Sequence, residues 1–223
     1  MFIELVDSLR CLEPHEETWL VAAVDRRDGR HIVHGTLACP ICRRAYPIRD
    51  GIGWFARDPV DAAPHLTISG GRADHRADER TDEDRVTRAA ALLGLVDAGG
   101  IVVLGGPWIE VADRLPALGV SHVVVLNAHT TPDSPQEVSA LVVEDQLPFR
   151  HTAVRACALG GETATAALLA SAATVLRSRG RLVGPVSASV PAAITELARD
   201  EADWVGERAA VASPPVPLRS ARR

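Results

Sequence analysis

The pattern of hydrophobic and polar positions divides the chain into two unlike halves. In the first half, apolar and polar residues alternate over 18–25 (TWLVAAVD) and over 30–37 (RHIVHGTL), which predicts two short strands. The intervening DRRDG supplies turn residues, and its Gly29 can adopt a positive φ without strain. The chain therefore begins with a small β module that contains a hairpin.

In the second half, continuous apolar runs alternate with longer, helix-like segments. Apolar runs without polar interruptions are typical of strands that are buried on both faces of a parallel sheet. The predicted helices cover 82–95, capped by Thr81, and 109–119, 161–180 and 191–203. The predicted strands cover 101–106, 122–127, 139–145, 153–160 and 181–186, with candidate closing strands at 205–211 and 215–220. Five parallel strands with helical crossovers predict an α/β class, a doubly wound Rossmann-like sheet.

Between the two halves, residues rich in Asp, Arg, Pro and Gly show no apolar period, which is typical of a linker. The predicted organisation is a β module over 1–56, a linker over 57–80, an α/β domain over 81–215 and a basic tail over 216–223.

Composition narrows the class of protein. The chain has 223 residues, 47% of them hydrophobic, and a net charge of −5, so a core can form and bulk attraction to nucleic acid is not indicated. No apolar run reaches the roughly 18–20 residues that span a bilayer. The first residues lack a basic, signal-like segment. We therefore expect a cytoplasmic protein without membrane contact; the sequence leaves its oligomeric state open.

The cysteines indicate a metal site. Cys39 and Cys42 have the two-residue spacing that allows both thiolates to face one ion. Cys11 and His15 lie upstream, separated by three residues, and complete a Cys3His set. Such a closed set of thiolates and one imidazole suits structural zinc. Zinc would also supply stability to a module too small for a substantial core.

Several alternatives remain open at this stage. The fourth ligand could instead be His31, His34 or Glu13. The cysteines could also pack as small hydrophobic residues, or Cys39 and Cys42 could form a redox pair. We expect a fourth cysteine, Cys157, to be a buried residue within an apolar strand.

The first module resembles a known family. The stretch LRC followed by LACPICRRAYPIRDGI is similar to the Trm112-like zinc ribbon, and the likeness covers about residues 1–56. Its most specific part is YPI at 46–48 and DGI at 50–52. At the first knuckle, CLEPH replaces the family's usual CPxC. The resemblance implies a structural zinc and a non-catalytic module that accompanies methyltransferases, with a protein partner contacted through the ribbon.

The α/β half resembles class I S-adenosylmethionine-dependent methyltransferases over roughly residues 82–215. The likeness is carried by IVVLGGPWIEVADRL, VVEDQLPFRHTAVRACALG and LRSRGRLVGPV. The resemblance implies that any cofactor contacts come from the loop glycines, from the residue that ends the second strand, and from an acidic pair that faces the adenine. These positions are Gly105, Gly106, Asn127, Glu144 and Asp145.

The cofactor loop departs from the family's acidic-x-Gly-x-Gly-x-Gly pattern. The corresponding positions here are Val103, Gly105, Pro107 and Ile109. The acidic residue is missing, and Pro107 removes a backbone donor and fixes φ. Trp108 is bulky where a backbone should approach the cofactor; it could plug a vacated pocket, belong to the core or contact a ligand.

Three functions follow from these patterns. The first is a methyltransferase-like protein with a zinc ribbon and a degenerate cofactor loop, which acts in binding or scaffolding without catalysis. The alternative is an active, divergent S-adenosylmethionine-dependent methyltransferase. The third is a binder of a different small molecule at the carboxyl ends of the strands. The sequence leaves open whether the protein is an enzyme.

Overall fold

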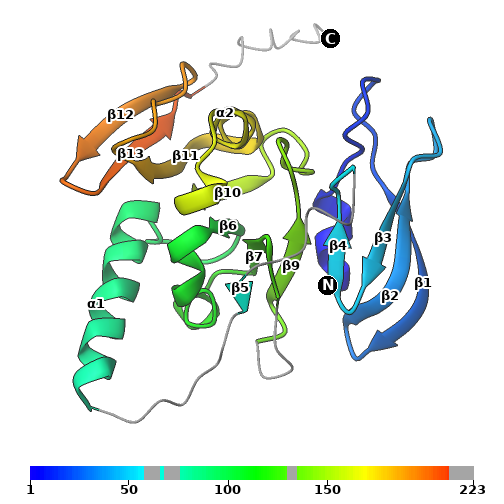
Figure 1. Cartoon of the computed structure of the whole chain (residues 1–223), viewed down its shortest axis with the longest axis horizontal. Coiled ribbons are helices and arrows are strands. Elements are labelled where there is room, and N and C mark those ends of the chain that lie inside the picture. The colour runs from blue at the N-terminus through cyan, green and yellow to red at the C-terminus, as the bar shows by residue number, and fades with distance from the viewer. Residues whose placement is uncertain (58–65, 68–75, 130–134, 211–223) are drawn as a thin grey trace, which may run out of the picture.

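The computed structural model describes residues 1–57, 66–67, 76–129 and 135–210 (Figure 1). The predicted basic tail and the candidate strand at 215–220 lie outside these residues, as does most of the predicted linker. None of the described helices is long and apolar enough to span a membrane.

The N-terminal module is a small antiparallel meander (Figure 1). It starts with a 3-10 helix, and its strands are paired in sequence order. The elements are η1 (Ile3–Ser8), β1 (Val21–Asp28), β2 (His31–Ala38), β3 (Ala45–Arg49) and β4 (Ile52–Trp54). The two predicted strands are therefore confirmed, each shifted a little toward the C-terminus.

The second unit contains the five predicted parallel strands in the order β9-β7-β6-β10-β11. Their bounds are β6 (Ile101–Gly105), β7 (His122–Leu126), β9 (Val138–Val142), β10 (Val154–Ala158) and β11 (Leu176–Pro185). All residues of β6, β9 and β10 are buried, as the continuous apolar runs predict. The order reverses between β6 and β10, which defines a doubly wound, Rossmann-like sheet.

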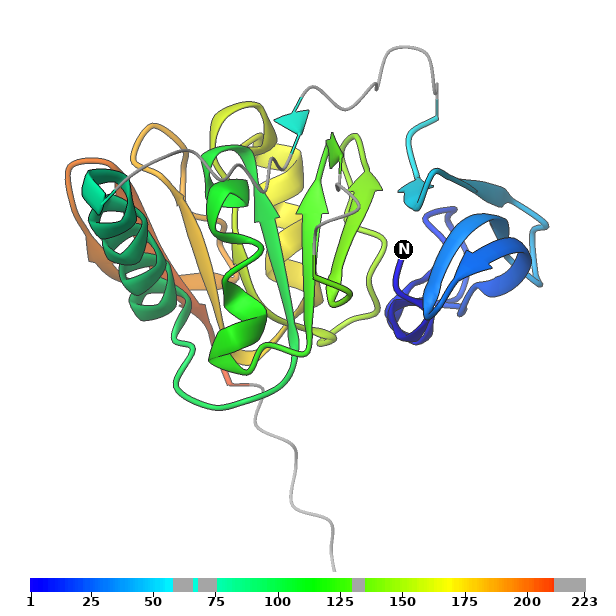
Figure 2. The ribbon, with the colours of Figure 1, turned by 90° about the horizontal axis from the view of Figure 1, so that it is seen from below.

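Helices cover both faces of this sheet (Figure 2). On one face α1 (Arg76–Leu93) buries Ala89 and Leu93 in a cluster with Val102 of β6. On the other face α2 (Ala166–Val175) packs in a cluster with Val103 of β6. Successive strand residues thus serve opposite cores, because side chains alternate across a strand.

Three predicted helices are helical in the structure, but their bounds or helix type differ from the prediction. The helix α1 begins at Arg76, so Thr81 lies inside it and does not cap it. The predicted helix over 109–119 is two short 3-10 helices, η2 (Gly106–Val111) and η3 (Leu115–Leu118), each with a proline in its first turn. The predicted helix over 161–180 is reduced to α2, which Thr165 caps by accepting a hydrogen bond from the Leu168 N–H at 3.1 Å.

The predicted helix over 191–203 is wrong. This segment forms an antiparallel hairpin of β12 (Ile194–Arg199) and β13 (Asp203–Arg208), and β13 pairs with β11. The reason lies in the core: Trp204 is fully buried and its Nε1–H donates to the Ala188 carbonyl at 2.9 Å. Gly184 on β11 leaves room for the Trp204 ring, which a Cβ there would approach to 2.5 Å.

The two units share one sheet. Strand β4 of the ribbon pairs in parallel with β9, which joins both units into an 11-stranded sheet. A Cβ at Gly53 would lie 2.8 Å from the Leu141 side chain, so glycine permits this close approach. A separate two-stranded sheet of β5 (Leu66–Thr67) and β8 (Ala128–His129) lies beside the α/β unit. The strands of the small module therefore continue the sheet of the α/β unit.

Candidate metal centre and strand-end crevice

The four predicted metal ligands lie together in the ribbon. One donor atom from each of Cys11, His15, Cys39 and Cys42 lies within 4.8 Å of all the others. The Cys11 and Cys42 Sγ atoms are 3.6 Å apart, and the Cys39 Sγ lies 3.4 Å from His15 Nε2. Tetrahedral zinc with Zn–S bonds of about 2.3 Å would hold two sulfurs about 3.8 Å apart. The donor set therefore fits zinc in both chemistry and spacing.

Two turns present these ligands. Around the Cys-x-x-Cys pair, the Cys39 N–H donates to the Arg44 carbonyl at 2.9 Å and the Arg43 N–H donates back to the Cys39 carbonyl at 3.0 Å. Upstream, His15 Nδ1 lies 2.7 Å from the Glu16 carbonyl. A hydrogen bond at Nδ1 leaves Nε2 as the free ligand atom, which is the usual second-shell arrangement of a metal-binding histidine.

Tyr46 contacts the ligand cluster through its hydroxyl group. Its hydroxyl lies 3.4 Å from Cys11 Sγ and accepts the Leu12 N–H at 3.0 Å. Burial raises the pKa of Tyr46, so this hydroxyl keeps its proton. Sequence reasoning singled out Tyr46 only as part of the family motif and missed this contact. The YPI motif was the available signal.

Ionisation differs among the ligands. Burial raises the pKa of the Cys11 thiol. At Cys39, burial opposes ionisation, but hydrogen bonds from the Cys42 and Ile41 backbones and from neighbouring thiols outweigh it and lower the pKa to about 7. The hydrogen bond to the Glu16 carbonyl raises the pKa of His15. A bound cation would favour the thiolate and neutral imidazole forms at all four positions.

The alternative fourth ligands are engaged elsewhere. His31 Nε2 lies 2.5 Å from the Gln136 carbonyl of the α/β unit. His34 pairs with Asp50 at 3.7 Å, and Glu13 pairs with Arg44 at 3.7 Å. The geometry therefore favours His15 over all three.

The strand ends where a doubly wound sheet binds ligands are closely packed. The loop after β6 meets the turn that follows β10, which includes η4 (Gly161–Thr163). A Cβ at Gly105 would overlap the Thr163 side chain, and a Cβ at Gly106, whose φ is +64°, would overlap the Gly160 carbonyl. The Gly160 N–H also donates to the Gly105 carbonyl at 3.2 Å. Both predicted loop glycines thus pack against the chain itself.

Pro107 and Trp108 complete this packing. A Cβ at Gly160 would come within 3.0 Å of Pro107 Cδ and 3.4 Å of the Trp108 ring. Trp108 is partly buried against the core on the α1 side of the sheet. Thr163 was missed in the sequence, because nothing in a linear pattern relates it to a glycine so far away in the chain.

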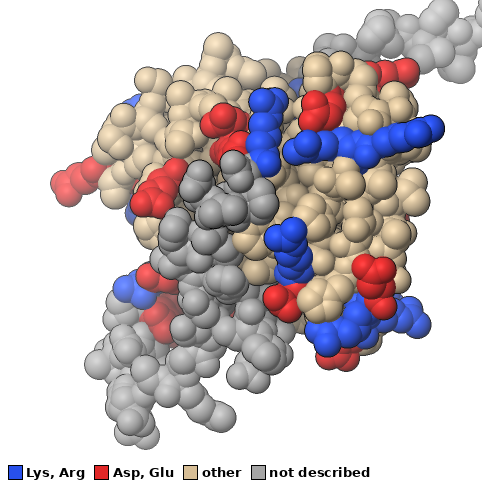
Figure 3. Space-filling model, turned by 45° about the vertical axis from the view of Figure 1, so that its right-hand side comes forward, with Lys and Arg blue, Asp and Glu red and all other residues tan. Residues whose placement is uncertain are grey.

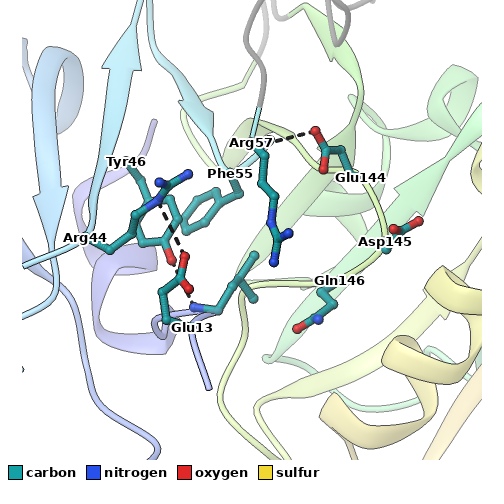
Figure 4. Close-up of a pocket in the computed structure, with 9 residues that line it drawn as sticks. Glu13, Arg44, Tyr46, Phe55, Arg57, Glu144, Asp145 and Gln146 are labelled. Carbon is teal, nitrogen blue, oxygen red and sulfur yellow. Dashed lines mark hydrogen bonds and ion pairs between the residues drawn. The ribbon is translucent and has the colours of Figure 1, made fainter. Parts of the chain in front are cut away.

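Two of the other predicted cofactor residues accept hydrogen bonds from the protein's own backbone. Asn127, with φ +55°, uses its Oδ1 to accept the Val143 N–H at 2.9 Å. Glu144 accepts the Arg57 N–H at 2.9 Å, and Asp145 lies next to it on the surface. Glu144 and Asp145 line a pocket toward the ribbon (Figure 4), whereas Gly105 and Gly106 lie two strands away at the end of β6. The five predicted cofactor residues thus follow or end three neighbouring strands, β6, β7 and β9, at the same edge of the sheet, and their role toward a cofactor stays a prediction.

The fold and the ligand cluster define the class: a small β module with a Cys3His cluster that fits zinc, joined to a doubly wound α/β unit. The family model described as Trm112p-like protein matches residues 15–51. This match confirms the predicted resemblance of the ribbon. A comparison with curated proteins finds no match.

Solved structures with a similar fold include methyltransferases. One chain of a complex between the Haloferax volcanii Trm112 methyltransferase activator and a methyltransferase is 15% identical, with a TM-score of 0.40, over 62% of this chain and 96% of that one. The Burkholderia thailandensis 1,6-didemethyltoxoflavin-N1-methyltransferase is 13% identical, with a TM-score of 0.43, over 60% and 82%. An S-adenosylmethionine-dependent methyltransferase from Mesorhizobium loti is 19% identical, with a TM-score of 0.33, over 42% and 50%.

These likenesses are remote, and no activity follows from them. The chain spans about half the length of the Mesorhizobium loti protein and of two other proteins that it matches.

Proposed function

We propose that this chain is a non-catalytic binding or scaffolding protein, in which a zinc-holding, Trm112-like ribbon is fused to a methyltransferase-like unit that does not bind S-adenosylmethionine. One observation carries the proposal. The crevice between the ends of β6 and β10, where strand order reverses and ligands bind in such sheets, is filled by Gly106 against Gly160 and by Thr163 against Gly105.

The competing function is an active, divergent methyltransferase. It would require the glycine loop to open and Asn127 and Glu144 to exchange their present backbone partners for cofactor. The Val143 N–H is partly buried, and a buried donor that loses its partner costs about 1–3 kcal/mol, so the hydrogen bond to Asn127 opposes such a rearrangement.

In this proposal zinc has a structural role. Cys11, His15, Cys39 and Cys42 would hold it with no position left for substrate. The ion would contribute folding free energy to a module with a small core of its own. Reduced thiols in a metal site also agree with the expected cytoplasmic location.

A protein partner would contact the ribbon. Five large apolar side chains of this module are exposed, and the most exposed are Trp19 by 63%, Val21 by 60% and Ile41 by 55%. On the face shown in Figure 3, basic and acidic side chains are interspersed and neither forms a continuous patch. Such a surface favours a protein over a nucleic-acid partner.

The test is a calorimetric titration with S-adenosylmethionine on protein whose zinc content has been measured, with a known methyltransferase as positive control. We expect about one zinc per chain and no saturable heat. Saturable binding at micromolar concentration at the strand-end crevice would overturn the proposal in favour of the active enzyme.

A further inference from the structure

A cavity lies at the junction of the two units, away from the filled crevice at β6 (Figure 4). Its volume is about 190 Å³, below the roughly 300–1,000 Å³ of drug-sized sites, so it suits a small ligand. The ribbon, the segment after β4 and the segment after β9 all contribute to it. Its lining residues are Leu12, Glu13, Arg44, Tyr46, Phe55, Arg57, Glu144, Asp145 and Gln146.

Contacts within the protein fix the apolar wall of this junction cavity. The rings of Tyr46 and Phe55 stack with their centroids 4.6 Å apart. The Tyr46 hydroxyl holds Leu12 through its N–H, and the Phe55 N–H donates to the Val142 carbonyl of β9 at 2.8 Å. Leu12 also lies between two metal ligands, Cys11 and His15, so the metal loop forms part of the wall.

Most charges around the cavity already have partners within the protein. Arg44 pairs with Glu13 at 3.7 Å, and Glu144 accepts the Arg57 backbone N–H. By contrast, no hydrogen bond or ion pair joins the Arg57 guanidinium, the Asp145 carboxylate or the Gln146 amide to any residue that the structure describes. In Figure 4 the Arg57 side chain extends into the space between the aromatic pair and the segment containing Asp145 and Gln146.

We propose that the junction cavity binds a small zwitterion of the α-amino-acid type. The Arg57 guanidinium receives the carboxylate, for which its planar donors are well shaped. The Asp145 carboxylate receives the ammonium group, and half-buried Leu12, beside the buried Tyr46–Phe55 pair, receives a short apolar side chain. The proposal is independent of catalysis, because the cavity lies at β9 and the closed crevice lies at β6, with β7 between them.

The test uses L-leucine and two half-ligands: 4-methylpentanoate, which lacks the amine, and 3-methylbutylamine, which lacks the carboxylate. Binding to the zinc-loaded full chain is measured by ligand-detected NMR titration. We expect saturable binding of L-leucine and at least about tenfold weaker binding of each half-ligand, since each loses one charge-assisted contact. Arg57→Ala and Asp145→Asn should each weaken L-leucine binding about tenfold or more.

Arg49→Ala is the matched control, because Arg49 lies over the Trp54 ring and does not line the cavity. It should leave L-leucine binding unchanged. The proposal is overturned if L-leucine does not saturate at millimolar concentration, if the half-ligands bind as well as L-leucine, or if Arg57→Ala has no more effect than Arg49→Ala. Because S-adenosylmethionine carries the same α-amino-acid group, its titration is repeated with the junction cavity saturated by L-leucine. Binding that survives this saturation bears on the proposed function, and binding that L-leucine abolishes bears on the junction cavity.

Discussion

Gly106 and Gly160 meet backbone to backbone at the point where the strand order of the sheet reverses. Gly106 has a φ of +64°, and a methyl group on it would overlap the Gly160 carbonyl. The two loops therefore interlock, and glycine is needed here for packing within the chain. In a cofactor-binding sheet, the same residue type would instead allow a ligand to approach.

Gly106→Ala should destabilise the protein by about 3 kcal/mol, through strain at a positive φ and the overlap with Gly160. The control is Gly29→Ala, where φ is +54° but nothing lies within 4 Å of the added Cβ, so only strain of about 1 kcal/mol is expected. Urea denaturation measures both. An equal loss of unfolding free energy at the two positions would show that the loops after β6 and β10 do not pack closely against each other.

Cys39→Ser should abolish stoichiometric zinc binding and unfold the ribbon, since structural zinc contributes on the order of 10 kcal/mol to such modules. Atomic absorption and circular dichroism measure the two effects. Cys157→Ala is the control: this cysteine lies in β10, fully buried and apart from the cluster, so the variant should keep its zinc. Metal-free protein that remains fully folded would contradict a structural metal.

Asn127→Ala should cost about 1–3 kcal/mol of stability, because the Val143 N–H loses its acceptor. Asn127→Asp keeps an acceptor at this position and should cost less. Urea denaturation with an unchanged m-value checks both variants. An Asn127→Ala variant as stable as the wild type would show that the Asn127 side chain does not stabilise the fold, and it would support a ligand-binding role for this residue.

Stability should fall as pH is lowered from 8 to 5, in protein prepared with Met1 as its first residue. Burial lowers the pKa of the Met1 amine from 8.0 to about 5. Between these values the unfolded chain binds more protons than the folded one, so the stabilisation is complete above pH 8 and is lost as pH falls. The loss is at most about 4 kcal/mol.

The control for this pH dependence is the Nα-acetylated chain, whose terminal amide does not titrate. The difference between the two preparations isolates the amine from Cys39 and His122, whose pKa values are also lowered. Identical urea midpoints for both preparations across this pH range would show that the amine is not buried.

The sequence predicts the parallel core well because its signal is local. Runs such as IVVLG and HVVVL are apolar throughout, and both form central strands. The hairpin after residue 191 is different: β12 buries only Ile194 and is otherwise exposed, so neither period 2 nor an apolar run marks it as a strand. Its conformation is set by Trp204 packing over Gly184, a tertiary contact that overrides local helix propensity.

The difference between local sequence signals and tertiary contacts also explains which site residues could be predicted. The spacing of Cys39 and Cys42 is local, and it pointed to a ligand set that the structure brings together. The packing of Thr163 against Gly105 and the cavity at Arg57 join segments far apart in the chain. Those relationships arise only from strand order, which the sequence does not encode in any short window.

The parallel pairing of β4 with β9 also constrains the order of folding. Residues Ile52 to Trp54 can form this pairing only after Ala140 to Val142 have been synthesised. Strand pairings between residues so far apart in the sequence form slowly, because the entropy of closing a long loop is lost before the pairing contacts stabilise the chain. During synthesis the ribbon therefore emerges first with an open strand edge at β4. Early metal capture would keep that unfinished module ordered until its neighbour arrives.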